Sequence, residues 1–246
     1  MDLEIFDSKI DLGRAAAAAA TKIIQAAIAA HGEAHLIAAT GASQFEFLDF
    51  LVREPIDWTK VVLFHLDEYV GLPETHPASF RRYLKERIVD RVNPRSFHFI
   101  NGDAGNAIEE CRRIGDLISR HSIDAAFVGI GENGHLAFND PPADFETKQP
   151  YLVVDLDEAC RNQQVGEGWF SGIDEVPNQA ISMSIGQIMK ARNILGIVPD
   201  ERKAQAVRNS IELAVSPLRP ASILQQHDSV TLYLDQHSAS LLNRKR

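Results

Sequence analysis

The sequence predicts an α/β fold in which helices cover both faces of a largely parallel central sheet, a modified Rossmann-like three-layer sandwich. Three observations support this. Apolar runs of strand length alternate with segments of helical period, which is typical of successive βα units. The 246 residues, of which 45% are hydrophobic, suffice for one large buried core. No repeat, long linker or change in composition divides residues 1–246, so we expect a single domain.

Six short apolar runs bounded by turn residues are predicted as strands, at 35–39, 61–66, 123–128, 151–155, 193–198 and 230–234. Six segments of helical period are predicted as helices, at 11–31, 44–53, 79–91, 107–121, 186–191 and 200–214. The alanine run at 15–20 favours a helix, and its small side chains allow that helix to lie close to the sheet.

The charge and the cysteine content exclude several classes of protein. A formal net charge of −9 argues against a nucleic-acid partner or an anionic membrane surface, since both need clustered positive charge. No apolar run approaches the roughly 20 residues of a membrane span, and the first residues lack the features of a signal peptide. Cys111 and Cys160 form neither a metal-type spacing nor a disulfide framework. We therefore expect a cytoplasmic protein with no metal, no membrane contact and no nucleic-acid partner.

Distinctive polar and glycine residues follow four of the predicted strands. Residues 40–43 follow the first strand, Asp67 and Glu68 end the second, residues 129–140 follow the third, and residues 199–203 follow the fifth. In open α/β sheets, ligands bind beyond the carboxyl ends of the strands. Four loops that meet at that edge predict one pocket for a small molecule.

The loop at 129–140 contains the strongest candidate for catalysis. His135 lies between Asn133 and Asp140 on an irregular glycine-rich segment, where no core position requires a histidine. A carboxylate bonded to one ring nitrogen fixes the tautomer and raises the basicity of the other nitrogen. We expect His135 to act in acid–base catalysis and the backbone of Gly131 to face the ligand. The alternative is a purely structural histidine.

The same loop formally matches the dinucleotide fingerprint G-x-G-x-x-G, with Asp155 near the position of a ribose-binding acid. That fingerprint requires a crossover helix after the third glycine, and Pro141 and Pro142 prevent a helix of useful length there. A nicotinamide enzyme is therefore not expected. The sequence also contains no G-x-S-x-G and no H-E-x-x-H segment, so neither a serine hydrolase nor a zinc peptidase of those types is predicted.

A second loop suits a phosphate group. Its residues join a strand to a helix and are Thr40, Gly41, Ala42, Ser43 and Gln44. Small side chains allow the backbone to approach a ligand, hydroxyls donate hydrogen bonds, and a helix N-terminus is partly positive. The alternative is that Ser43 only caps the helix.

Two cations are candidates for the same anion. Lys203 lies in the first turn of a predicted helix, where a cation opposes the helix dipole, so an anionic ligand would explain its position. A plain surface lysine is the alternative. Arg161, which follows the strand at 151–155, is the second candidate.

Asp67 is the candidate general base. It ends the apolar run at 61–66, and a carboxylate partly removed from water at a strand end has its pKa raised towards neutrality. The alternative is that the acid caps a loop. The neighbouring Glu68 is expected to face away from the ligand and to serve structure.

Several segments carry a resemblance to a known family, and they occur in the family's order: 66–72 with 76–80, then 129–140, then 176–177 with 180–183, and 202–204. In these segments the chain resembles the glucosamine-6-phosphate deaminase family, also called glucosamine-6-phosphate isomerase. The matching segments span most of the chain from Thr40 onward. The first two segments are the most specific.

The resemblance implies an enzyme of amino-sugar metabolism that couples aldose–ketose isomerisation to deamination, giving fructose 6-phosphate and ammonia without metal or redox cofactor. His135 would assist opening of the sugar ring, with Asp140 and Asn133 orienting it. Asp67 would move the proton from C2 of the open chain to C1 through an enolamine, and water would hydrolyse the resulting imine. The loop at 40–44 and Lys203 would hold the phosphate, beneath a mobile lid at 142–170.

Two departures from the family pattern affect this expectation. Asp140 stands where many members have glutamate, which keeps the charge and shortens the reach by one methylene. The family's Arg-Phe-Phe, which supplies a phosphate-binding arginine, is replaced by Gly168, Trp169 and Phe170. Either Arg161 and the segment 162–164 take over, or the anionic end of the ligand is bound differently.

Other functions stay open at the level of sequence. A 6-phosphogluconolactonase also has a glycine-rich loop with a histidine, but it usually continues as Thr-Ala-Ser where this chain has Leu136, Ala137 and Phe138. A sugar-phosphate sensor without turnover is the non-enzymatic alternative. The sequence leaves open a galactosamine phosphate as substrate and a homo-oligomer as the assembly.

Overall fold

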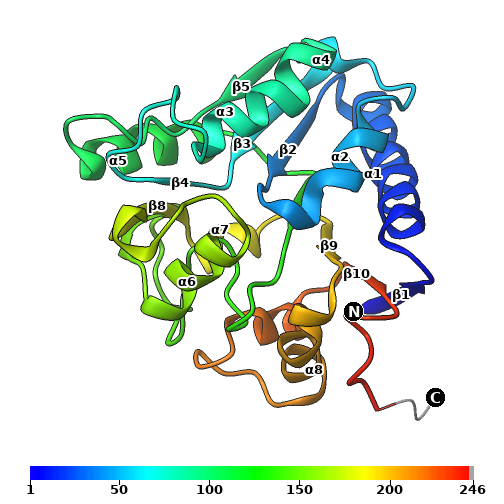
Figure 1. Cartoon of the computed structure of the whole chain (residues 1–246). Coiled ribbons are helices and arrows are strands. Elements are labelled where there is room, and N and C mark those ends of the chain that lie inside the picture. Colours follow the sequence, from blue (N-terminus) through cyan, green and yellow to red (C-terminus); the bar gives the residue numbers. More distant parts are fainter. Residues whose placement is uncertain (244–246) are drawn as a thin grey trace.

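The computed structural model describes residues 1–243 and contains a seven-stranded sheet in the order β1-β10-β9-β6-β2-β3-β5 (Figure 1). All neighbouring strands in this sheet are parallel. The strands are β1 (Asp2–Phe6), β2 (Ala34–Ala38), β3 (Val61–His65), β5 (Ser96–His98), β6 (Ala125–Val128), β9 (Ile194–Val198) and β10 (Val230–Asp235). The predicted parallel sheet is confirmed.

Helices cover both faces of the sheet, and each face has its own apolar core. One face packs against α1 (Lys9–His31), α2 (Phe45–Leu51) and the helical run formed by α3 (Phe80–Leu84), η3 (Lys85–Val89) and α4 (Asp90–Val92). The other face packs against α5 (Ala107–Ile118), α7 (Ile185–Ile188) and α8 (Ala204–Glu212). Successive strand residues alternate between the two cores, as Leu36 and Ile37 of β2 do. The chain therefore has the predicted three layers.

Helix α1 behaves as its alanine run predicts. Ala16, Ala17 and Ala20 are fully buried against the sheet. The side chain of Ser8 caps the N-terminus by accepting from the backbone N–H of Asp11, and Gly32 ends the helix at a φ of 83°.

A second, smaller sheet lies beside the first, at the left of Figure 1, and consists of β4 (Asp67–Tyr69), β8 (Gln179–Met183) and β7 (Tyr151–Asp155) in the order β4-β8-β7. Both of its pairings are antiparallel. The predicted bounds of β7 are right, but its expected place in the parallel sheet is wrong. The partner β8 was not predicted, and only this pairing places β7 outside the main sheet.

Four strands and one helix escaped prediction: β1, β4, β5, β8 and α6 (Glu158–Gly166). Strand β1 lies at the sheet edge, where Leu3 and Ile5 are exposed, and its five residues are too short a run to stand out in the sequence. The predicted helix at 200–214 starts later, because Asp200 has a φ of 90° and a 3₁₀ turn precedes α8.

Short 3₁₀ segments connect the main elements: η1 (Ala42–Gln44), η2 (Trp58–Lys60), η4 (Ile173–Glu175), η5 (Glu201–Lys203) and η6 (Pro220–Gln226). Within residues 1–243 we find no helix whose length and apolar character would let it cross a bilayer.

Helix α1 packs closely on the first turn of α2, and Gly13 lies at the contact. A methyl group at this position would lie 2.8 Å from the carbonyl carbon of Glu46 and 2.9 Å from the nitrogen of Phe47. We expect Gly13→Ala to lower the free energy of unfolding by about 1–3 kcal/mol, despite alanine's higher helix propensity. Urea unfolding measures this. Gly105→Ala is the control, because nothing lies within 4 Å of its added methyl; equal urea midpoints for the two variants would contradict the packing argument.

Candidate active site

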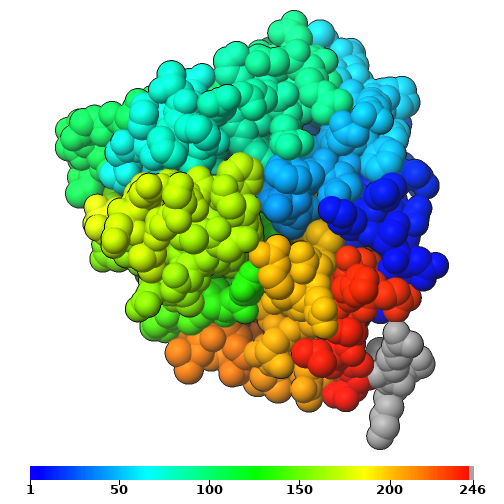
Figure 2. All heavy atoms as spheres, in the orientation of Figure 1, coloured from blue at the N-terminus to red at the C-terminus, as the bar shows by residue number. Residues whose placement is uncertain are grey.

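Four adjacent strands of the main sheet, β9, β6, β2 and β3, bring their carboxyl ends to one edge, where a pocket opens. The chain continues from β2 to β3 on one side and returns to β6 on the other, so this edge is a topological switch point. In Figure 2 the blue segment after β2, the gold segment near residue 200 and the yellow-green segment near residue 165 meet there. The pocket lining includes Thr40, Gly41, Ala42, Ser43, Asp67, Gly131, His135 and Lys203.

The loop after β2 presents its backbone to this pocket. Gly41 has a φ of 97°, which favours glycine, and its carbonyl accepts a hydrogen bond of 3.0 Å from the hydroxyl of Tyr83. Thr40, Gly41, Ala42 and Ser43 all line the pocket as predicted. Gln44 does not line it: its fully buried side chain donates to Ser43 Oγ at 3.0 Å and lies inside the protein.

His135 is held by the two neighbours that the sequence singled out. Its Nδ1 lies 3.0 Å from Oδ1 of Asp140, and its backbone N–H donates to Oδ1 of Asn133 at 3.0 Å. Asn133 in turn donates to Oδ1 of Asp140 at 2.9 Å. Burial acts to raise the pKa of Asp140, but the bonds and charge of His135 and the bond from Asn133 bring it below the ordinary value. The imidazole therefore has a fixed orientation, and His135 lines the pocket.

Gly131 leaves the space that the imidazole of His135 occupies. The backbone of Gly131 packs directly against the ring of His135, and a methyl group there would overlap Cε1, Nε2 and Cδ2. Its N–H also donates to the carbonyl of His135 at 3.0 Å. Only glycine leaves room for the ring in this position.

Asp67 is buried at the start of β4, and its Oδ1 has no hydrogen-bond partner among the described residues. Burial, with the nearby charge of Glu68 as a second cause, raises the pKa of Asp67 to about 8. A carboxyl group with this pKa exchanges a proton near neutral pH, as a general base must. Asp67 and His135 both line the same pocket, as the sequence predicts.

Glu68 points the other way and serves structure, which confirms the prediction. Its carboxylate accepts from the backbone N–H groups of Tyr69, Phe80 and Arg81 and from the hydroxyl of Ser79. The bonds from Ser79, Phe80 and Arg81 lie at the N-terminus of α3, where an acid is favoured. Glu68 thereby ties β4 to the helical layer and fixes the backbone from which Asp67 extends.

The two predicted cations have different positions. Lys203 lines the pocket and is the only lysine or arginine among its described lining residues. The guanidinium of Arg161 turns away and donates to the carbonyls of Ile173 at 2.6 Å and Val176 at 3.1 Å. Arg161 does not line the pocket, because these backbone acceptors hold it between α6 and η4.

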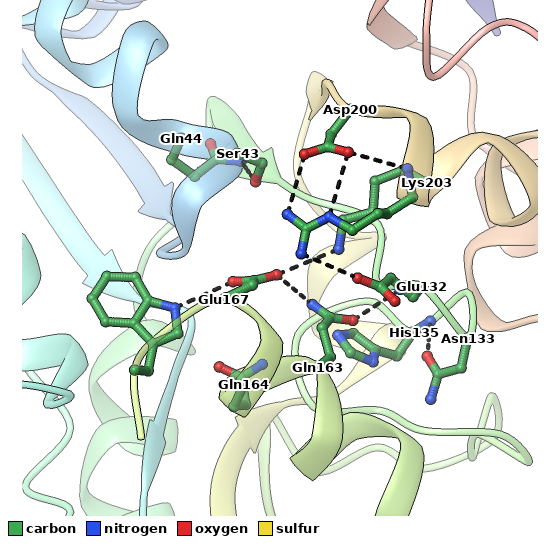
Figure 3. Close-up of polar contacts among 12 residues, drawn as sticks. Ser43, Gln44, Glu132, Asn133, His135, Gln163, Gln164, Glu167, Asp200 and Lys203 are labelled. Carbon is green, nitrogen blue, oxygen red and sulfur yellow. Dashed lines mark hydrogen bonds and ion pairs between the residues drawn. The ribbon is translucent and has the colours of Figure 1, made fainter. Parts of the chain in front are cut away.

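Three lining residues come from the predicted lid segment (residues 142–170): Gln163, Gln164 and Glu167. Gln163 and Gln164 belong to the segment considered as a substitute for the missing arginine. Glu167 was not predicted, since an acid between two glycines gives no local signal of a ligand site. Figure 3 shows its carboxylate directed towards Lys203 and Gln163.

One group of side chains in residues 1–243 has a geometry that suits a metal ion. Ligand atoms of His135, Asp140 and Cys160 lie within 4.8 Å of one another. Burial, followed by the charges of Asp140 and Asp157, raises the pKa of the Cys160 thiol well above its ordinary value. A protonated thiol is a poor metal ligand, so this trio fits a histidine–carboxylate pair better than a metal centre.

Comparison with known proteins decides the family. Residues 7–233 match the family described as glucosamine-6-phosphate isomerases/6-phosphogluconolactonase. The chain belongs to this family. Family relatives include the glucosamine-6-phosphate deaminase of Oenococcus oeni, 35% identical over 245 residues and 100% of both chains. That of an Exiguobacterium species is 37% identical over 82% of this chain and 78% of the relative.

Solved structures in the family agree with the fold. A structure described as a monomeric glucosamine-6-phosphate deaminase matches with a TM-score of 0.90 at 31% identity, covering 98% of this chain and 100% of that one. A 6-phosphogluconolactonase from Shewanella baltica matches with a TM-score of 0.78 at 19% identity, over 96% and 97% of the two chains. The latter likeness shows the shared fold alone.

The raised pKa of Asp67 predicts a pH-dependent stability. The folded chain retains this proton up to about pH 8, whereas an unfolded aspartate releases it near pH 4. The wild-type free energy of unfolding therefore falls as pH rises from about 4 to about 8. Asp67→Asn has no titrating group at this position. Its free energy of unfolding, relative to that of the wild type, should therefore rise by a few kcal/mol between pH 5 and pH 9. Urea unfolding at each pH measures this, and a pH-independent difference would show that Asp67 is ionised throughout.

Proposed function

We propose that this chain converts glucosamine 6-phosphate and water into fructose 6-phosphate and ammonia. The observation that carries the proposal is the placement of the Asp67 carboxyl and the His135 imidazole on one pocket. Relatives that span the whole chain are named glucosamine-6-phosphate deaminase, which supports the same reaction.

His135 opens the sugar ring in the proposed mechanism. Proton transfer between the ring oxygen and the C1 hydroxyl releases the open-chain aldehyde, and an imidazole suits this because it accepts and donates near neutral pH. Asp140 and Asn133 position the imidazole through the contacts described above. Both are therefore positioning residues.

Asp67 moves the proton that isomerises the sugar. Its ionised carboxylate removes the proton from C2, giving an enolamine, and returns it to C1, giving an imine of fructose 6-phosphate. Water adds to the imine carbon, and ammonia leaves. Asp67 has an unpartnered oxygen and a pKa raised to about 8, so it can alternate between the two protonation states. Protein groups and water balance every step, so the proposal includes no cofactor.

The phosphate of the substrate binds at the other end of the pocket in this proposal. The backbone and hydroxyls of the loop at residues 40–43 and the ammonium of Lys203 line that end. The lid segment, residues 142–170, covers it through Gln163, Gln164 and Glu167. Arg161 and Gln44 have no part in binding, because neither faces the pocket.

The proposed setting is the cytoplasm. Cys111 and Cys160 are both free and buried, which suits a reducing compartment. Association into a homo-oligomer stays a prediction that light scattering can test.

One assay tests the function. Purified protein is incubated with glucosamine 6-phosphate, and ammonia and fructose 6-phosphate are followed together; we expect both in equal amounts. Galactosamine 6-phosphate tests the stereochemistry at C4. Hydrolysis of 6-phosphogluconolactone with neither deamination product would assign the chain to the lactonases instead. Tight binding of the amino sugar without turnover would indicate a sensor.

Asp67→Asn tests the assigned base. We expect it to slow exchange of the C2 hydrogen with solvent deuterium by about 10²-fold or more, while the dissociation constant of the sugar changes only a few-fold. Proton NMR follows the exchange, and calorimetry follows the binding. Asp116→Asn, the same change on an exposed face of α5, is the control. Undiminished exchange in Asp67→Asn would remove this residue from the mechanism.

A further inference from the structure

Besides Asp67, the pocket is lined by a second acidic residue, Glu167, and its carboxylate contacts the ammonium of Lys203. Nζ of Lys203 is 3.5 Å from Oε1 of Glu167, and each side chain is only 7% exposed. Glu167 follows α6 directly, within the lid segment, and its backbone N–H donates to the carbonyl of Gln163. An acid carried by the lid therefore neutralises the ammonium that is available to an anionic ligand.

Other contacts hold this carboxylate in place. Gln163 donates to Oε1 of Glu167 at 2.8 Å, and the indole N–H of Trp169 donates to Oε2 at 3.2 Å (Figure 3 shows the Gln163 contact). An ammonium, an amide N–H and an indole N–H thus surround a buried carboxylate. Such donors suit any oxyanion, including a phosphate monoester.

The Glu167–Lys203 pair also lines two neighbouring cavities. The catalytic pocket has a volume of about 70 Å³, and a neighbouring cavity lined by Ser8, Asp200 and Arg202 has about 670 Å³. Glu167 and Lys203 line both. Ligand pockets usually have about 300 Å³ or more, so a hexose phosphate requires the smaller pocket to widen, and Glu167 and Lys203 stand where it meets the larger cavity.

We propose that Glu167 occupies the anion position on Lys203 when no ligand is bound, and that the phosphate of the substrate must displace it. Glu167 then acts as a specificity-determining residue, which sets how tightly the pocket binds a phosphate monoester. The identity of that ligand as a sugar phosphate rests on the proposed function. The competition for Lys203 rests only on the geometry.

Electrostatics gives the competition its direction. Two anions cannot share one buried ammonium without strong repulsion, since a dry site weakens screening. A phosphate dianion therefore binds only after the Glu167 carboxylate has left Lys203. Breaking the Glu167–Lys203 contact costs free energy, so it weakens the binding of the phosphate. Removing the charge of Glu167 while keeping its shape should strengthen phosphate binding.

Glu167→Gln makes that change: it removes the charge and keeps the shape, and its one amide oxygen can still accept from either Gln163 or Trp169, which donate to different oxygens of the carboxylate. We expect its dissociation constants for inorganic phosphate and for glucosamine 6-phosphate to fall about tenfold relative to wild type, the size of one buried charge contact. Calorimetry measures both constants, and the KM of the variant should fall in parallel. Glu158→Gln is the control, since Glu158 is an exposed acid at the other end of α6, the helix that Glu167 follows.

A fluorescence measurement on the wild type gives a second readout. The chain has two tryptophans, and the other, Trp58, is buried in the core of the sheet. Displacement of Glu167 removes the hydrogen-bond acceptor of the Trp169 indole. Adding inorganic phosphate should therefore change the tryptophan emission of the wild type, and Trp169→Phe should abolish the change.

The outcomes separate this inference from the proposed function. Equal or weaker phosphate binding by Glu167→Gln would overturn the inference, even if the protein deaminates its sugar. No fluorescence response at phosphate concentrations that calorimetry shows to be saturating would overturn it as well. Tighter phosphate binding by Glu167→Gln, without deamination by the wild type, would support the inference and leave the proposed function wrong.

Discussion

The site depends on one constraint, which is the parallel order β9-β6-β2-β3 in the main sheet. Parallel strands end at the same edge, so four loops that are far apart in the sequence meet there. Each loop supplies a different chemical group, from the backbone donors after β2 to the ammonium after β9. The helices on both faces bury the strands and so hold the strand ends, from which the loops extend, in fixed positions.

The smaller antiparallel sheet adds what the main sheet lacks, which is a carboxylate aimed into the pocket and a cover above it. Strand β4 carries Asp67 and Glu68 in opposite directions, because successive residues of a strand alternate sides. Glu68 accepts from three donors at the start of α3 and from the N–H of Tyr69 in β4, whereas Oδ1 of Asp67 has no partner among the described residues. One dipeptide thus supplies both the anchor and the reactive group, and the anchor holds the reactive group in place.

Charge is distributed unevenly along the pocket. The His135–Asp140 pair and Asp67 place titratable groups on the pocket, and Lys203 places a positive charge there. Glu167, which precedes Gly168, adds a negative charge next to this ammonium. In the proposed mechanism, sugar chemistry and anion binding therefore use separate groups in one pocket, and Glu167 of the segment 142–170 contacts the cation.

The sequence alone determined the features that depend on neighbouring residues. These are the parallel strands, the loops that follow them, and the histidine at 135 with its partners at 133 and 140, since short spacing already brings such residues together. Only the tertiary structure decided that β7 joins a second sheet, that Arg161 turns to backbone carbonyls, and that Glu167 reaches Lys203. Strand pairing and side-chain direction at these places depend on contacts between distant segments, which local composition does not encode.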